Sequence, residues 1–188
     1  MIFYLFLYLI PAYLALSYFK ANKSLKIING VLFLCVFSLA IGMRWEVGGD
    51  WATYLQIMES ARNVSFSNAL QLNDPGYMAL NWLSLKLGFD ILGVNLICGA
   101  VFTWGLLVFC KKQPLPWLAF SVATPYLLIV VAMGYTRQGA ALGFVMLALC
   151  CLQDKRTSFF LFYTLVGALF HKSAVVLLPL FIFCNNKG

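Results

Sequence analysis

The sequence predicts an all-α, polytopic transmembrane helical bundle with about seven or eight apolar segments. Of its 188 residues, 63% are hydrophobic and only 10% are charged, whereas soluble domains carry about 25% charged residues. The mean hydropathy is +0.89, and several apolar runs approach the roughly 20 residues that a membrane-spanning helix needs. The Lys and Arg residues behind the net charge of +7 occupy short gaps between these runs, as membrane topology requires. Nucleic acid is not an expected partner, because no basic cluster with interleaved aromatic residues lies outside the runs.

The apolar runs define one integral membrane domain over residues 1–188. Its N-terminus is apolar from Ile2 and has its first basic residue at Lys20, whereas a signal peptide carries basic residues before its apolar region. We therefore expect a retained first span with its N-terminus outside. The last two expected spans could instead form one broken pair around His171. The expected spans cover residues 2–19, 27–43, 91–110, 117–133, 139–152, 158–170 and 173–184.

Residues 77–88 decide the topology, because a run of about a dozen residues is more often interfacial or re-entrant than spanning. If it does not cross, eight of the thirteen basic residues fall on one face, which the positive-inside rule makes cytoplasmic. These eight are Lys20, Lys23, Lys26, Lys111, Lys112, Lys155, Arg156 and Lys187. The opposite face then receives Arg44, Asp50, Asp74, Arg137 and His171. We expect the run not to cross, so that these five side chains share one face.

Residues 44–76 form the longest segment that cannot lie in hydrocarbon, and we expect an extracytoplasmic loop with amphipathic interfacial helices. Apolar side chains at i, i+3, i+4 and i+7 indicate such a helix: Trp51, Tyr54, Leu55 and Met58. Asp50 lies directly before it, as an N-cap or as a group with chemical work to do. Asp74 and Pro75 mark the start of another helix. Tyr54 and Tyr77 suit either an interfacial aromatic belt or stacking on sugar rings.

Three side chains at the ends of apolar runs are candidates for chemistry, and each also has a simpler explanation. Arg137 has apolar runs on both sides and suits phosphate oxygens, or it only reaches lipid headgroups. His171, the sole histidine, suits proton transfer near neutral pH, or it is structural at a helix boundary. Arg44 directly follows an expected span and either binds an anion or ends that helix. One histidine, and six cysteines without a CxxC pair, make no metal site; we expect no metal and no cofactor.

Four short motifs occur in order along the chain. They are Gly48-Gly49-Asp50-Trp51-Ala52-Thr53-Tyr54 after a run ending in Arg44, Asp74-Pro75-Gly76-Tyr77 followed by Asn81, Arg137-Gln138-Gly139-Ala140, and Phe170-His171-Lys172-Ser173. In this order and in a polytopic membrane protein, they resemble the EpsG family of exopolysaccharide and O-antigen polymerases, the Wzy-like proteins, over nearly the whole chain. Members of that family are usually longer, so we expect a member that is shortened at its C-terminus.

The resemblance implies a multi-pass glycosyltransferase of the bacterial inner (plasma) membrane, with its active face toward the periplasm or the outside. Its substrate would be an oligosaccharide repeat unit linked to undecaprenyl diphosphate, which the enzyme joins to the next unit. Expected partners are this lipid-linked glycan, the bilayer and other membrane proteins of polysaccharide assembly. Supporting roles are implied for Gly49, Tyr54, Asp74, Tyr77, Gln138, Lys172 and Ser173.

A mechanism follows as a hypothesis. Lipid diphosphate is a good leaving group when fixed cations meet the charge that develops on it, and Arg137 and Arg44 would supply them. The acceptor hydroxyl needs a base, either Asp50 or His171; we favour Asp50 as the base, with His171 orienting the acceptor or the phosphate.

Two other classes of function fit part of the pattern. A transporter or flippase of lipid-linked sugars would also bury charges, but it predicts polar residues at mid-span and inverted repeats. Here the polar residues cluster at span ends and no repeat is visible. A non-catalytic scaffold, or a non-catalytic fragment of a polymerase, predicts that replacing Arg137 by Lys or Gln changes nothing.

Overall fold

The computed structural model describes residues 2–17 and 23–185, and within these ranges the chain is helical and contains no β-strand. Of the twelve segments, η1 is a π-helix and η2 is a 3-10 helix. In chain order they are α1 (Ile2–Leu16), α2 (Lys23–Gly42), α3 (Trp51–Arg62), α4 (Phe66–Leu72), α5 (Pro75–Leu87), α6 (Asp90–Lys111), α7 (Pro116–Ala123), η1 (Thr124–Ala132), α8 (Thr136–Gln153), α9 (Thr157–Phe170), η2 (Lys172–Leu177) and α10 (Leu180–Asn185).

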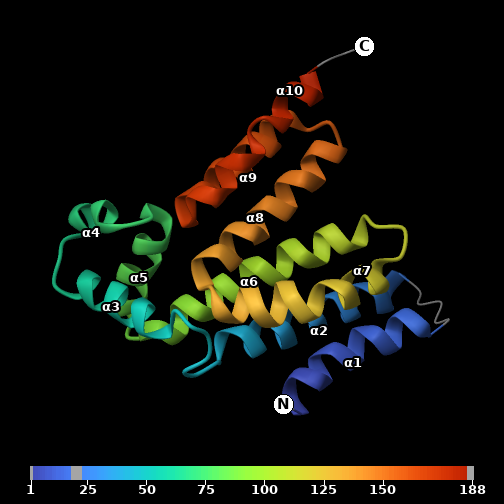
Figure 1. Ribbon diagram of the computed structural model, residues 1–188, viewed down its shortest axis with the longest axis horizontal. Helices are drawn as coiled ribbons and strands as arrows, with labels where there is room; N and C mark the ends of the chain where they lie inside the picture. Colours follow the sequence, from blue (N-terminus) through green and yellow to red (C-terminus); the bar gives the residue numbers. More distant parts are fainter. Residues whose placement is uncertain (1, 18–22, 186–188) are drawn as a thin grey trace.

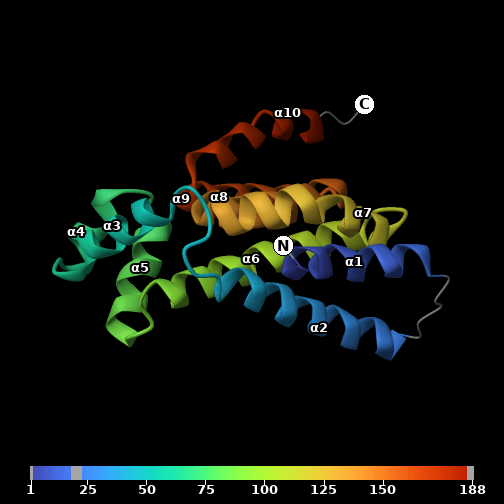
Figure 2. The ribbon, with the colours of Figure 1, turned by 60° about the horizontal axis from the view of Figure 1, so that its bottom comes forward.

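Helix α6 lies at the centre of the bundle (Figures 1 and 2). Helices α2 and α8 pack on it, α9 packs on α8, and α1 packs on α7. A Cβ atom on Gly105 of α6 would lie 2.2 Å from the carbonyl oxygen of Gly143 in α8. The backbones of α6 and α8 therefore touch where they cross, as small residues permit between membrane helices.

Aromatic side chains fill the space between α2 and α7. The rings of Phe33 and Phe37 stack with centroids 5.3 Å apart. Phe120 of α7 lies edge-on to both of these rings, with centroid distances of 5.7 and 5.1 Å. Phe37 and Phe120 are fully buried, so this cluster fastens α2 to the second half of the chain.

A second cluster of buried apolar residues joins the α3 and α5 helices to α6 and α8. Its members are Tyr54, Met58, Tyr77, Ile91, Val94, Cys98 and Ala140. Leu55, which the helical spacing placed on the same face as Tyr54, is instead 42% exposed, and the buried face of α3 runs through Tyr54, Met58 and Ala61.

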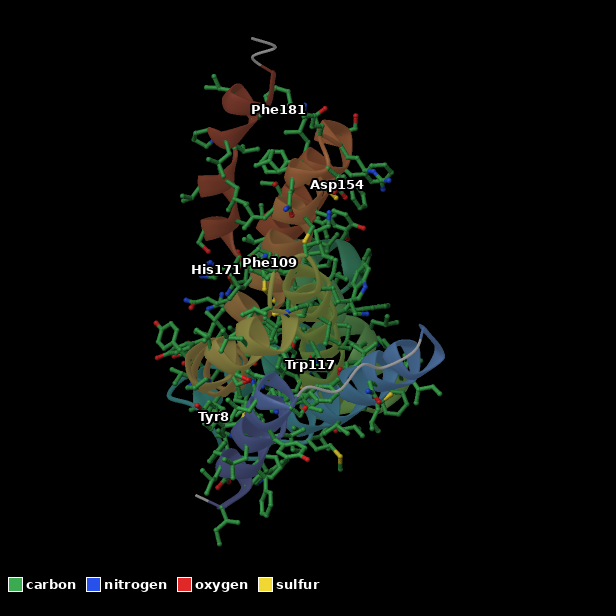
Figure 3. All side chains as sticks on the ribbon, turned by 90° about the vertical axis from the view of Figure 1, so that its right-hand side faces the viewer. Tyr8, Phe109, Trp117, Asp154, His171 and Phe181 are labelled. Atoms are coloured by element: carbon green, nitrogen blue, oxygen red, sulfur yellow. The ribbon has the colours of Figure 1, made fainter. Side chains whose placement is uncertain are left out.

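Residues 44–87, which we call the polar loop, lie at one end of the bundle. Its helices α3, α4 and α5 form a small group beside the last turn of α2 and the first turn of α6 (left in Figures 1 and 2). At the other end, Lys112 after α6 forms an ion pair with Asp154 after α8. Figure 3 shows Asp154 and Phe181 near the top of the view and His171 lower, where α9 turns into η2. That the run 77–88 does not cross a membrane stays a prediction.

By length and composition, one helix of the described residues, α6, is long and apolar enough to cross a membrane. Shorter apolar stretches cover Ile2–Leu16, Ile28–Gly42, Pro116–Ala132, Thr157–Phe170 and Lys172–Ile182. The expected all-α structure is confirmed for the described residues, whereas the expected seven or eight spans are not confirmed.

Two expected spans have an internal irregularity. The run expected over residues 117–133 is continuous, but its second half, η1, is a π-helix that contains Pro125. Proline removes one N–H donor from the helical ladder, and π segments form the alternative i→i+5 pattern. The run expected over residues 173–184 is not one helix, because it consists of η2 and α10. Helix α9 ends at Phe170, directly before His171.

Candidate functional site

The candidate site lies at the break between η1, which ends at Ala132, and α8, which begins at Thr136. A Cβ atom on Gly48 would lie 2.7 Å from both the Cα atom and the carbonyl oxygen of Gly134, and Gly48 has a φ of +101°. Only glycine combines this φ with so close an approach. The polar loop is therefore seated directly on the break, next to the first turn of α8, which carries Arg137.

Arg137 bonds the residues that begin α5. Its Nη1 donates to Oδ2 of Asp74 and to Oδ1 of Asn73, both at 3.0 Å. The Asp74 side chain is 7% exposed and that of Arg137 is 20% exposed. Two motifs that are far apart in the sequence thus meet in one mostly buried ion pair.

The local structure of α5 leaves the Asp74 carboxylate free for this pair. Pro75 is the first residue of α5, as expected, and Asp74 occupies the N-cap position without a side-chain capping bond. The backbone carbonyl of Asp74 accepts from the N–H of Met78 at 2.9 Å. The backbone N–H of Asp74 donates to Oδ1 of Asn73 at 2.9 Å. This bond fixes the backbone that carries the Asp74 carboxylate.

Two tyrosine rings form a platform for the Arg137 guanidinium. Its Cζ atom lies 5.8 Å from the Tyr54 ring centroid and 6.0 Å from that of Tyr77, and the two centroids are 5.8 Å apart. These distances are in the range of cation–π attraction. Burial and, next, the charge of Asp50 raise the pKa of Tyr54. Burial raises the pKa of Tyr77 well above its ordinary range. Both phenol groups beside the guanidinium therefore keep their protons at neutral pH.

Asp50 occupies the N-cap position of α3, but its side chain makes no capping bond. The capping explanation therefore covers its backbone only, whose carbonyl accepts from the N–H of Tyr54 at 3.0 Å. The side chain is half-buried, and its charge acts on the Tyr54 hydroxyl. Through this backbone bond to Tyr54 we group Asp50 with the Arg137 cluster, which we define as Asp50, Tyr54, Asp74, Tyr77 and Arg137.

Arg44 is more deeply buried than Arg137, with 6% exposure. Its Nη1 donates to the carbonyl oxygen of Ala132 at 3.0 Å and to that of Ile41 at 3.2 Å. Its Nη2 donates to the Thr136 hydroxyl and, at 3.4 Å, to Oδ1 of Asn95. Arg44 therefore ties the end of α2 to η1, α6 and the start of α8.

His171 lies at the turn that follows α9. The Ser173 backbone N–H donates to its Nδ1 at 3.3 Å, and the Ser173 hydroxyl lies 2.8 Å from the same atom. Because Nδ1 accepts from the backbone, the neutral ring carries its proton on Nε2. A Cβ atom on Gly76 in α5 would lie 2.9 Å from the Leu169 side chain, so the end of α9 packs against the start of α5. His171 is thus placed near the start of α5, and no hydrogen bond among the described residues joins it to the Arg137 cluster.

The other expected site residues lie at the margin. Gln138 and Lys172 are exposed, Ser173 serves His171, and Gly49 has open space where a Cβ atom would stand. The position that sterically requires glycine is therefore 48 and not 49. Sequence reasoning missed Asn73, Asn95 and Thr136 as partners of the two arginines; the position of Asn73 directly before Asp74 was the available signal for one of them.

Within the described part of the chain, the Arg137 guanidinium has one unused donor, in a cluster whose two carboxylates outnumber its single cation. The Nε atom of Arg137 is buried without a hydrogen-bond partner among the residues that the structure describes, so the guanidinium has donor capacity that Asp74 and Asn73 do not use. Arginine forks are well matched to phosphate oxygens. Within residues 2–17 and 23–185, no three His, Cys, Asp or Glu side chains are grouped so that they could hold a metal ion.

Comparison with known proteins gives one result on the family level. The EpsG family matches residues 27–188, a range that includes every residue of the Arg137 cluster as well as Arg44 and His171. No curated protein and no solved structure matches the chain. Since the family match covers most of the sequence, the chain belongs to the EpsG family.

Proposed function

We propose that this protein is a membrane glycosyltransferase that joins oligosaccharide repeat units carried on undecaprenyl diphosphate, as in exopolysaccharide or O-antigen synthesis. Family membership supports a polysaccharide polymerase-like activity. The observation that carries the proposal is the Arg137–Asp74 ion pair, since it joins two separate motifs in a mostly buried site and leaves the Nε atom of Arg137 without a partner among the described residues.

In the proposed reaction, a hydroxyl of the acceptor unit attacks the anomeric carbon of the donor sugar. A new C–O bond forms while the C–O bond to the lipid diphosphate breaks, and the bonding electrons leave on the diphosphate oxygen. Arg137 stabilises the charge that grows there, because contacts that strengthen toward the transition state accelerate the step.

The proton of the attacking hydroxyl passes to the carboxylate of Asp50 in this proposal. Asp50 makes no side-chain capping bond, which leaves its oxygens available to accept. His171, whose neutral ring offers Nε2–H, orients the acceptor or a phosphate oxygen. The rings of Tyr54 and Tyr77 face the Arg137 guanidinium at cation–π distance and offer aromatic surface beside it.

The first test replaces Arg137 by Lys in the full chain, expressed in a bacterial strain that lacks its own polymerase of this pathway. Lys keeps the charge but lacks the planar fork, so we expect a loss of polymer of at least tenfold on a carbohydrate gel, with lipid-linked single units accumulating on the outer face of the membrane. The matched control is Arg62→Lys, because Arg62 is exposed and paired with Glu59 in the same loop; polymer length should not change.

The alternatives give different results in the same strain. A flippase would leave the single units on the inner face when Arg137 is replaced. A scaffold would make normal polymer with Arg137→Lys, and that result would overturn the proposed role. To separate the two candidate bases, Asp50→Asn is compared with His171→Gln. A general base contributes about 100- to 10,000-fold, so the loss should be of that order for Asp50→Asn and smaller for His171→Gln.

A further inference from the structure

An apolar groove lies between α1 and α2, and Arg44 is among the residues that line it. Its volume is about 560 Å³, and its walls include Phe3, Leu7, Val36 and Ala40. Ligand sites in proteins commonly have volumes of about 300–1,000 Å³ and mostly apolar walls. Arg44 is the one charged side chain among the described residues that line this groove.

The charge of Arg44 is not balanced within the described part of the chain. Arg137, Arg62 and Lys112 each have a carboxylate within ion-pair distance, whereas the hydrogen bonds of Arg44 all go to uncharged oxygens. Its Nε atom is buried and has no partner among the described residues. A buried charge without a counter-ion is unfavourable, so the site gains stability from an anion.

A groove with mostly apolar walls and a single cation among its described lining residues matches an amphiphile with an anionic head. We propose that the lipid half of the donor substrate lies in this groove, with its isoprenoid chain between α1 and α2 and a phosphate group near Arg44. This inference rests on the proposed function, which makes the donor a lipid diphosphate.

The proposal gives the two arginines different tasks. Arg44 and the groove hold the lipid carrier, while Arg137 acts where the bond to the sugar breaks. Arg44 also bonds the Thr136 hydroxyl, and Thr136 directly precedes Arg137 in α8. The lipid site and the Arg137 cluster are therefore adjacent along the backbone.

The test measures binding rather than polymer formation, so that its failure is distinct from failure of the proposed function. The full chain is placed in phosphatidylcholine nanodiscs and titrated with geranylgeranyl diphosphate, with geranylgeraniol, inorganic diphosphate and phosphatidylglycerol as comparison ligands. We expect geranylgeranyl diphosphate to bind at least tenfold more tightly than each of the three.

Val36→Trp is the variant that fills the groove without touching Arg44. It should weaken binding of geranylgeranyl diphosphate at least tenfold, and Arg44→Gln should do the same. The control is Val31→Trp, because Val31 is also exposed on α2 but does not line the groove; its affinity should stay within twofold. Arg44→Gln removes hydrogen bonds between helices and could prevent folding. In that case the comparison of Val36→Trp with Val31→Trp tests the proposed lipid site.

Three outcomes would overturn the proposal. If geranylgeraniol binds as tightly as geranylgeranyl diphosphate, Arg44 does not bind a phosphate group. If phosphatidylglycerol binds as tightly, the groove is an ordinary lipid site. If Val36→Trp binds geranylgeranyl diphosphate normally while Arg137→Gln does not, the groove is wrong and the proposed reaction at Arg137 still stands.

Discussion

The carboxylate of Asp74 bonds Arg137, which lies 63 residues further along the chain, and not the N–H groups of the helix that Asp74 itself begins. An aspartate at an N-cap position ordinarily accepts from its own helix. Here the capping bond is forgone, and the ion pair fastens the polar loop to α8.

Asp74→Asn should therefore destabilise the protein through Arg137. The substitution leaves a mostly buried guanidinium without its counter-charge, and loss of one partner of a buried pair lowers the free energy of unfolding by about 3–5 kcal/mol. Chemical unfolding in mixed micelles measures this change. Asp90→Asn is the control, since Asp90 is exposed and lies 3.9 Å from Arg62; exposed pairs contribute less than about 1 kcal/mol. If the double variant Asp74→Asn/Arg137→Gln loses the sum of both single effects, the two residues are not coupled.

Gly48→Ala should weaken the seating of the polar loop, and Gly49→Ala should not. Alanine at position 48 meets the backbone of Gly134 and must adopt a positive φ, and such strain costs about 1–3 kcal/mol. Alanine at position 49 enters open space. Limited proteolysis between residues 44 and 76 reports on this seating, with faster cleavage expected for Gly48→Ala alone. Equal cleavage of the two variants would contradict the close approach to Gly134.

Gly105→Ala should separate α6 from α8. Its Cβ atom would stand 2.2 Å from a backbone oxygen of Gly143, and backbone cannot yield as a flexible side chain does. Overpacking of this kind costs about 1–3 kcal/mol, to be read from unfolding in a dodecyl sulfate titration. Gly49→Ala again serves as the matched glycine replacement, and an unchanged midpoint for Gly105→Ala would show that the two helices are not in backbone contact.

The titration of Tyr54 should report on Asp50. Burial and the nearby negative charge of Asp50 raise the pKa of Tyr54 above its ordinary value of 10.0. Because the unfolded chain loses this proton first, the stabilisation is complete below pH 10 and is lost as pH rises through the folded pKa of Tyr54. Asp50→Asn should lower that pKa, as followed by absorbance at 295 nm, with Tyr54→Phe identifying the signal. Asp90→Asn should leave it unchanged, and an equal shift with either variant would separate Asp50 from the cluster.

Much of the helical framework could be predicted because apolar runs end where polar or helix-breaking residues begin. The run ending before Arg44 corresponds to α2, and Pro75 does begin α5. The exposed position of Leu55 could not be predicted from helical spacing, since Leu55 and Tyr54 both fit the apolar side of α3 and only the packing of α3 on α5 and α6 decides which of them is buried.

The candidate site was predictable as a group but not as a geometry. Charge counting placed Asp50, Asp74 and Arg137 on one face, yet the Asp74–Arg137 bond depends on how α5 and α8 pack. The partners of Arg44 were harder still, because Asn95 and Thr136 are uncharged and lie inside apolar helices. Nothing in their local sequence distinguishes them from residues that only pack.

The π-helical segment η1 makes the site tolerant of one particular change in chain length. An i→i+5 segment accommodates one residue more than an α-helix closing over the same distance. A deletion of one residue between Thr124 and Ala132 would therefore let η1 close as an α-helix while the residues after it keep their phase. The bonds of Arg44 to the Ala132 carbonyl and to Thr136, and of Arg137 to Asp74, should then survive. The same deletion inside a regular α-helix such as α6 would instead turn every residue after it by about 100°.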